Sequence, residues 1–563
     1  MASGFAGAAD DGDIGASQIC REDTMIKRRT LLALAGSTAI AAVTGTAKAQ
    51  GSSTDAPVVA TKSGKVRGAT SDGIHVFKGI PYGASTAGAN RFRPPKPPAP
   101  WTDVRDALNF APMAPQAIRN NLGGLFASWT FDKEISEDCL AINVWTPALR
   151  DGVKRPVMVW FHGGSYSSLS GSRNVFDGTR LCKKGDVVVV TLNHRLNAFG
   201  FLYLAEIAPE FADGANAGMQ DLVAALQWVR DNITEFGGDP ENVTIFGQSG
   251  GGGKVSTIMA MPAGKGLFHR AIVQSGSYSR RAHLEAMKPA EATQYARALL
   301  AALEIGPAEA GKKLLELPMD ALVAGLKKAP SLAWAPVADG RTLPSGPWWP
   351  EGPTISADIP LMIGTAETEM TMLIGTNDPT TFSLDDAGLR KRLSAFMSAD
   401  DMEPVIQTFK ASRPNATPSE LFFAISTAIP FRRGAWQQAD RKAAQNAAPV
   451  YLYELDWHTP VDGGKWQSPH SLDLAMVFDN VAKSESMVGK GPEAQKVADQ
   501  MSAAWLAFAR TGNPNAKGIP NWQPYTTKDR ATMVFNVESR VVNAFRDDER
   551  KVLSELKAID RQP

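Results

Sequence analysis

Short apolar runs, separated by glycine-rich or polar turns, recur through most of the chain. Several of them show little alternation of apolar and polar residues, so both faces of each expected strand are buried, as in a mainly parallel sheet. These runs span residues 156–162, 186–193, 242–246, 271–274, 359–364 and 449–455. An alternating stretch ahead of them, 58–68, predicts a hairpin.

Between the expected strands, apolar residues recur with the spacing that is typical of helices. Leu222, Leu226 and Val229 recur at intervals of three and four residues, which predicts an amphipathic helix over 218–236. The Gly-Gly-Asp-Pro segment 237–240 is expected to end it. Further helices are expected over 289–328 and 494–511. The alternation of strand and helix predicts an α/β layer fold.

Composition excludes several classes of protein. The 563 residues are 44% hydrophobic and 21% charged, which is too apolar for a disordered chain. Because 59 basic residues balance 58 acidic ones, no strong overall field attracts nucleic acid. The chain shows no internal repeat and no long linker, so we expect a single domain over 50–563, following a leader over 1–49.

The expected leader has the three parts of an export signal. Basic residues 27–29 precede a mild apolar run, 31–43, and small residues at 47 and 49 suit signal peptidase. The pair Arg28-Arg29 resembles a twin-arginine signal, which predicts export to the periplasm or the medium. Met25 is an alternative start of translation. No other segment approaches about 18 uninterrupted apolar residues, so we expect no stable membrane insertion.

Metal chemistry of the common kinds is not indicated. The three cysteines form no Cys-x-x-Cys pair, and the seven histidines form no His-Glu-x-x-His motif. Three cysteines in so long a chain are also no disulfide scaffold. We therefore expect neither a metal nor a cofactor.

The sharpest chemical feature is Gly-Gln-Ser-Gly-Gly at 247–251, directly after the expected strand 242–246. A nucleophilic serine needs a tight strand-to-helix turn with small neighbours, and Ser249 has that context. The N–H of Gly250 would then face developing negative charge. The alternatives are a structural turn or a phosphate loop, but the Gly-Lys-Ser/Thr ending of a phosphate loop is missing.

A second glycine-rich turn follows another buried strand. His162, Gly163, Gly164 and Ser165 resemble the His-Gly-Gly-Gly motif that supplies oxyanion N–H groups in lipases and esterases. The alternative interpretation is an ordinary turn at the end of a strand.

Several longer segments of the chain resemble the type-B carboxylesterases, the family of cholinesterases and bacterial para-nitrobenzyl esterases. The matching segments are 77–83, 91–95, 136–140, 236–240 and 266–272. The resemblance implies an α/β-hydrolase fold, with a large, mostly parallel central sheet flanked by helices. It also implies a Ser–Glu–His triad that hydrolyses neutral carboxylic esters through an acyl-enzyme, with a small ester as the partner molecule.

The resemblance places the acid at Glu369 and the base at His470, after Ser249 in the order that this fold uses. Glu367 is the alternative acid. His458 is the alternative base, but it lies nearer the end of the preceding strand and is interpreted as structural.

By the same resemblance, Gly164, Ser165 and Gly250 form the oxyanion hole. Gln248 and Ser275 are expected close behind the reacting groups. Two of these positions depart from the family pattern, because Gln248 replaces a glutamate and Ser165 replaces a glycine.

Other family features imply structure rather than chemistry. The family cysteine that pairs with Cys139 corresponds to Ala114, so Cys139 and Cys182 are expected as free thiols. Two structural ion pairs are implied, namely Arg91–Glu137 and Arg195–Asp221.

Two other functions remain possible beside a serine esterase on neutral esters. The same triad serves amide or carbamate hydrolysis, and some relatives are non-catalytic adhesion proteins, although those usually lose a member of the triad. The segment 348–350, Trp-Trp-Pro, either lines a pocket or is a packed loop.

Overall fold

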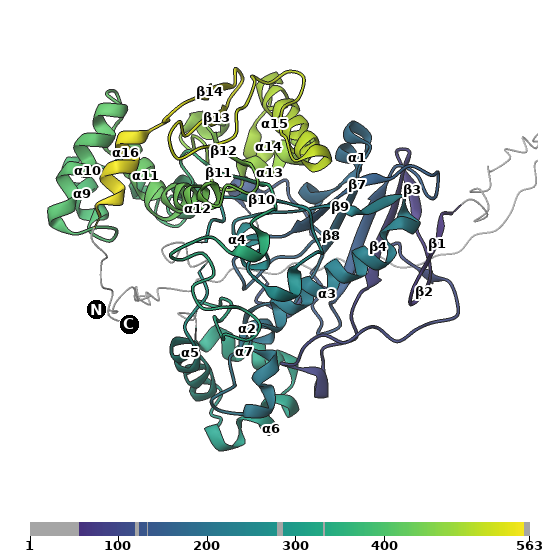
Figure 1. The fold of residues 1–563 in the computed structure, drawn as a ribbon. Helices are drawn as coiled ribbons and strands as arrows, with labels where there is room; N and C mark the ends of the chain where they lie inside the picture. Colours follow the sequence, from purple (N-terminus) through teal and green to yellow (C-terminus); the bar gives the residue numbers. More distant parts are fainter. Residues whose placement is uncertain (1–55, 119–122, 132, 279–284, 330–332, 557–563) are drawn as a thin grey trace, which may run out of the picture. The chain divides into compact units, whose positions relative to one another are not determined.

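The computed structural model describes residues 56–118, 123–131, 133–278, 285–329 and 333–556. They belong to one compact unit, Ala56–Lys557 (Figure 1). The expected leader, 1–49, lies outside the described residues.

The core of this unit is an eleven-stranded sheet with the order β14-β13-β12-β11-β10-β9-β7-β8-β6-β4-β3. Neighbouring strands from β13 through to β8 in this order are parallel. At one end β14 pairs antiparallel with β13, and at the other end β6, β4 and β3 continue from β8 in antiparallel pairs. The strand bounds are β3 (Ala69–Ser71), β4 (Ile74–Pro81), β6 (Ala141–Thr146), β7 (Arg155–Phe161), β8 (Val188–Leu192), β9 (Gly238–Gln248), β10 (Arg270–Gln274), β11 (Leu361–Ala366), β12 (Val450–Leu455), β13 (Thr532–Phe535) and β14 (Arg540–Val542). The large, mostly parallel sheet that the apolar runs predicted is therefore confirmed.

A smaller sheet joins β1 (Val58–Thr61), β2 (Gly64–Arg67) and β5 (Arg105–Asp106). Its first two strands are the hairpin expected over 58–68.

Both faces of the large sheet are covered. Along β7, Val157 and Val159 pack into one apolar cluster, whereas Met158 and Trp160 pack into another. The first cluster includes helices α3 (Ala217–Asn232) and α4 (Gly250–Ile258). The second includes α1 (Thr179–Gly185), α13 (Leu472–Val477) and α15 (Pro492–Thr511). Burial on two faces explains the absence of alternation in the strand sequences, and each fully buried aliphatic side chain contributes about 1.5–3 kcal/mol.

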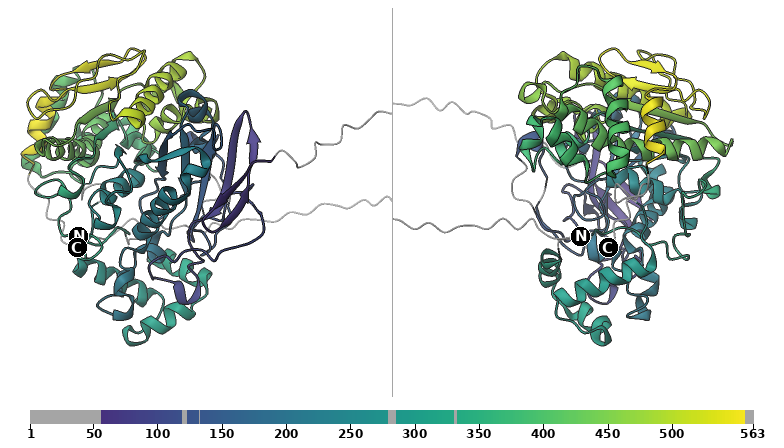
Figure 2. Two further views of the ribbon diagram at one scale, coloured as in Figure 1. Left: turned by 45° about the vertical axis from the view of Figure 1, so that its right-hand side comes forward. Right: turned by 90° about the vertical axis from the view of Figure 1, so that its left-hand side faces the viewer.

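Seven further helices form two groups at the periphery. Helices α5 (Pro289–Ala302), α6 (Ala310–Glu316) and α7 (Met319–Lys328) lie together, away from α9 (Asp386–Leu393), α10 (Ala399–Ser412), α11 (Pro418–Thr427) and α16 (Asp547–Ser554) (Figures 1 and 2). The first group matches the expectation for 289–328. The helices over 386–444, which include α12 (Arg433–Ala444), were not predicted, although Thr417 and Glu420 form a capping box that marks the start of α11.

Helix α3 ends at Asn232 and continues as a 3₁₀ turn, Ile233–Phe236, which Gly237 caps with a left-handed φ of 76°, so the predicted stop is confirmed. The Gly-Asp-Pro part of segment 237–240 also begins strand β9, which was expected to start only at 242. The pairing with β7 shifts register between Arg155 and Val157, so Pro240, which has no N–H to donate, is tolerated at the irregularity.

None of the helices in the described part of the chain is long and apolar enough to cross a membrane.

Candidate active site

Ser249 occupies a strained turn between β9 and α4. Its φ of 58° and ψ of −128° fall in a region that side chains other than glycine rarely adopt. A Cβ at Gly247 would collide with the backbone of Gly251, so the turn closes only because position 247 is glycine. The serine is half-buried at the end of a central strand.

The turn after β7 packs against the serine turn. A Cβ at Gly250 would collide with the backbone of Ser165. Within the described residues, the N–H groups of Gly164 and Ser165 have no protein acceptor, whereas the N–H groups of Ser167 and Ser168 both donate to the Gly164 carbonyl at 3.1 Å. The predicted oxyanion donors are thus free to bind a ligand oxygen.

Glu369 follows β11 and is completely buried. Its Oε1 accepts the Ala366 N–H at 2.8 Å, and its Oε2 accepts a hydrogen bond from Nδ1 of His470. Because the carboxylate holds the proton on Nδ1, the other ring nitrogen, Nε2, carries the lone pair that a general base needs.

The free side of the His470 ring meets the residue that precedes the serine. Nε2 of Gln248 donates to Nε2 of His470 at 3.3 Å, and Oε1 of Gln248 accepts from Oγ of Ser471 at 3.3 Å. The Phe431 ring lies 5.3 Å from the imidazole, centroid to centroid. Sequence reasoning missed Phe431, which lies on a π-helical turn, Ala428–Arg432, a kind of irregularity that is frequent at functional sites.

The arrangement joins four chemical parts: a half-buried serine on a strained turn, an imidazole with a free lone pair, a buried carboxylate that orients it, and backbone N–H groups without an acceptor among the described residues. Together these parts suit acyl transfer through a covalent intermediate.

Comparison with known proteins decides the family. The model of the carboxylesterase family matches residues 55–552. The chain belongs to the carboxylesterase family.

Individual esterases match along almost their whole length. The para-nitrobenzyl esterase of Bacillus subtilis (strain 168) is 36% identical over 507 residues, covering 88% of this chain and 98% of the relative. The phenmedipham hydrolase of Pseudarthrobacter oxydans is 31% identical over 496 residues, covering 86% of this chain and 96% of the relative. The crystal structure of the Geobacillus stearothermophilus carboxylesterase EST55 at pH 6.2 aligns with a TM-score of 0.76 at 37% identity, covering 88% and 99% of the two chains. These matches confirm the α/β-hydrolase fold and a serine esterase function.

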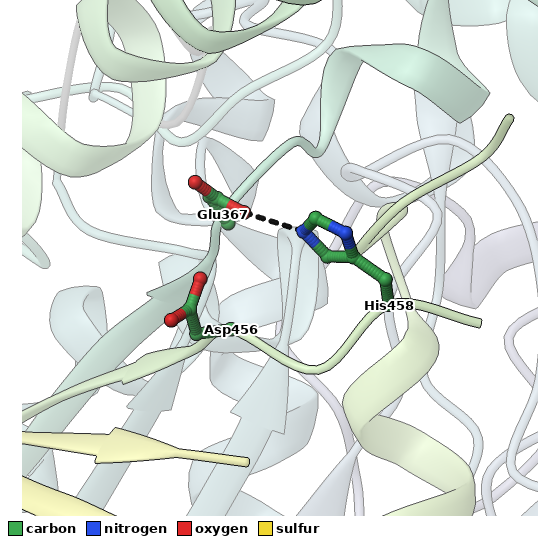
Figure 3. Close-up of side chains that lie close together, drawn as sticks. All are labelled: Glu367, Asp456 and His458. Atoms are coloured by element: carbon green, nitrogen blue, oxygen red, sulfur yellow. Dashed lines mark hydrogen bonds and ion pairs between the residues drawn. The ribbon is translucent and has the colours of Figure 1, made fainter. Parts of the chain in front are cut away.

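The alternative acid and base of this carboxylesterase are bound to each other. Nε2 of His458 lies 2.7 Å from Oε2 of Glu367, as Figure 3 shows. Oε1 of Glu367 accepts a hydrogen bond from Arg546 at 2.7 Å. This pair is separate from the hydrogen bond between Glu369 and His470.

Asp456 joins Glu367 and His458 (Figure 3), and their potential metal-ligand atoms lie within 4.8 Å of one another. Arginines already neutralise the two carboxylates, because Arg546 binds Glu367 and Arg540 lies 3.1 Å from Asp456. A divalent cation would meet these guanidinium groups, so the cluster has the character of an ion-pair network.

Two further buried polar residues lie behind the triad. The Ser275 N–H donates to the Gly364 carbonyl at 2.8 Å, and its Oγ has no hydrogen-bond partner within the described residues. Asp473, which the sequence analysis gave no role, accepts from Nε2 of Gln274 at 2.7 Å. Burial raises the pKa of the Asp473 carboxyl to about 7. Asp473 is the one charged residue in the apolar helix α13, and this contrast is visible in the sequence.

The expectations about ion pairs and thiols are confirmed. Glu137 binds Arg91, and Asp221 binds Arg195 at 2.6 Å, with all four side chains buried. Cys139 and Cys182 are free and buried.

For Trp348, the structure supports the packed-loop interpretation of the Trp-Trp-Pro segment. Trp348 is packed, with its Nε1 donating to the Ser256 carbonyl at 2.7 Å, so it belongs to the core. Trp349 is 64% exposed, and the guanidinium of Arg441 lies 4.2 Å from its ring centroid.

Proposed function

We propose that this carboxylesterase hydrolyses neutral carboxylic esters with Ser249 as nucleophile, His470 as general base and Glu369 as the orienting acid. The observation that carries the assignment is the hydrogen bond from Nδ1 of His470 to the buried Glu369, beside the strained serine turn.

The proposed reaction depends on the tautomer of His470, in which Nδ1 carries the proton and Nε2 is free to accept one. Nε2 of His470 takes the proton of the Ser249 hydroxyl as Oγ attacks the ester carbonyl, and the same proton is then given to the departing alcohol. Water attacks the resulting acyl-enzyme with the same base and releases the acid. Glu369 stabilises the imidazolium that forms in each half-reaction.

The N–H groups of Gly164, Ser165 and Gly250 would stabilise the oxyanion of each tetrahedral intermediate. Each such donor typically contributes on the order of 3 kcal/mol to the barrier. Two of them have no competing acceptor among the residues that the structure describes, so they need not break a protein hydrogen bond in order to act.

Neutral substrates are proposed because Gln248 puts an amide, and not a carboxylate, against His470. Without a negative charge there, the site gives a cationic alcohol group no electrostatic advantage.

The test is Ser249→Ala, with hydrolysis of a para-nitrophenyl ester as the assay. We expect a loss on the order of 10⁴- to 10⁶-fold in kcat. An organophosphate should label wild type at Ser249 and leave the variant unlabelled. Ser502→Ala, at a buried serine of α15, is the matched control and should keep its activity. Retained activity in Ser249→Ala, with label at another serine, would contradict the proposal.

We further propose export by the twin-arginine route, on the strength of Arg28 and Arg29 ahead of an apolar run. Replacing both arginines with lysine should retain the esterase in the cytoplasmic fraction of an expressing cell. Unchanged export of this variant would refute the route.

A further inference from the structure

Lys254 is a fully buried lysine close to the serine turn. It lies in α4, five residues after Ser249, and its side chain is 0% exposed. Among the residues that the structure describes, no carboxylate lies within ion-pair distance of its Nζ, and burial lowers the pKa of the Lys254 side chain well below its usual range. A buried lysine without a counter-ion is unfavourable, so its position requires an explanation.

Its hydrogen bonds go to the turn that carries the oxyanion donors. Nζ of Lys254 donates to the His162 carbonyl at 2.8 Å and to the Gly163 carbonyl at 3.5 Å. It also lies 5.6 Å from the ring centroid of Tyr166, the residue that follows the turn. All of its polar contacts in the described part of the chain are therefore with the oxyanion turn.

The geometry of the peptide bond connects this contact to catalysis. In a planar trans peptide, the C=O and the N–H point in opposite directions. The Gly163 carbonyl shares its peptide with the N–H of Gly164, so a donor that holds this carbonyl from inside the fold turns the N–H outward. The hydrogen bond from Nζ also polarises the peptide and strengthens the N–H as a donor.

The rest of the turn is held in the same manner. The Gly163 carbonyl accepts a second hydrogen bond, at 3.0 Å, from Nδ1 of His162. The Gly164 carbonyl, which shares its peptide with the N–H of Ser165, accepts from the N–H groups of Ser167 and Ser168. The two oxyanion peptides that follow β7 are thus fixed through their carbonyls, and Lys254 is the only one of these donors that comes from outside segment 162–168.

We infer that Lys254 is a positioning residue of the oxyanion hole, which orients and polarises the Gly163–Gly164 peptide through its carbonyl oxygen. It touches neither the substrate nor the triad. The inference rests on the proposed function, because an oxyanion hole matters only if the ester carbonyl reacts there.

The test is Lys254→Met, which keeps the apolar stem and removes the donor. We expect kcat to fall about 10- to 100-fold while KM changes little, since the lost interaction acts in the transition state. Affinity for a trifluoromethyl ketone, whose serine adduct carries an oxyanion, should fall by the same factor as kcat/KM. If Lys254 only supported the fold, the loss of inhibitor affinity and the loss of kcat/KM would not be equal.

Lys442→Met is the matched control. Lys442 is also fully buried, and its Nζ donates to two backbone carbonyls, those of Ser356 at 2.9 Å and Ala357 at 2.6 Å, but these belong to the segment before β11. This variant should lose thermal stability to a similar degree and keep the wild-type kcat and inhibitor affinity.

If Lys254→Met does not fold, Lys254→Gln retains an N–H donor on a shorter side chain and should show a smaller loss of kcat, at least threefold, again with little change in KM. Wild-type kcat in a folded Lys254 variant, or equal losses of kcat in the Lys254 and Lys442 variants, would overturn the inference. Ser249→Ala, measured in parallel, separates the two hypotheses, because activity retained there refutes the proposed function itself.

Discussion

The side-chain nitrogen of Gln248 lies 3.3 Å from Nε2 of His470, the ring nitrogen proposed to receive the Ser249 proton. The amide can donate to this nitrogen, but it brings no charge. Wild type should therefore hydrolyse a choline ester more slowly than a neutral ester of matched size.

Gln248→Glu tests the electrostatic part of this argument. A carboxylate at this position stabilises the imidazolium, so the acid limb of the kcat/KM profile should move to higher pH. It should also improve the ratio of choline ester to neutral ester, by about 3- to 10-fold. The measurement is kcat/KM against pH for both esters. An unchanged ratio and profile would mean that the new carboxylate does not face the site.

His458 should matter for stability and not for catalysis. Burial lowers the pKa of the His458 imidazole, but the hydrogen bond and charge of Glu367 outweigh burial, and the net pKa is raised. A raised pKa means that the protonated pair stabilises the fold fully below the unfolded pKa, and that this stabilisation is lost as pH rises through the folded value.

His458→Ala should therefore lower the melting temperature more at pH 6 than at pH 9, with kcat within about twofold of wild type. His470→Ala is the comparison and should lose nearly all activity. Loss of activity in the His458 variant alone would reverse the assignment of the base.

Asp473 should make the fold less stable at alkaline pH. Burial raises the pKa of its carboxyl to about 7, so the folded state binds the proton more tightly than the unfolded chain does. The associated stability is present in full below about pH 4 and is lost as pH rises through about 7.

Asp473→Asn removes this titration and keeps a group that can bond to Gln274. As pH rises from 4 to 9, the free energy of unfolding of the variant should increase relative to that of wild type by on the order of 2–4 kcal/mol. Urea unfolding of both proteins at the two pH values measures it. A constant difference between the two proteins would show that Asp473 is ionised throughout.

Ser165 holds a left-handed φ of 52° in the oxyanion turn, and its side chain is exposed. Its Cβ and hydroxyl narrow the space beside the reacting carbonyl, so wild type should prefer esters of primary alcohols over tertiary ones. Ser165→Gly should reduce this preference on the order of tenfold and relieve about 1 kcal/mol of backbone strain. The measurement is kcat/KM for a matched ester pair in both proteins. An unchanged ratio would show that the side chain points away from the alcohol.

Much of the fold could be predicted from the sequence, because the signals are local. The buried strands appear as unbroken apolar runs, and α3 as a three-and-four spacing. The serine turn is also local, since the glycine at 247 lets the end of β9 lie against the backbone of Gly251 in α4. Strand β9 was only partly predicted, because its first residues pair with β7 through a register shift that no local pattern shows.

The partners of the site residues depend on strand order, which no short segment specifies. Glu367 and Glu369 are two residues apart, and the sequence favoured Glu369 only through family resemblance. The packing of the loops after β11 and β12 brings His470 to Glu369, 101 residues away in the chain, and His458 to Glu367, 91 residues away. Lys254 likewise looks like an ordinary polar residue of a short helix. Its burial beneath the oxyanion turn follows only from β9 lying beside β7, which puts the start of α4 against the carbonyl ends of His162 and Gly163.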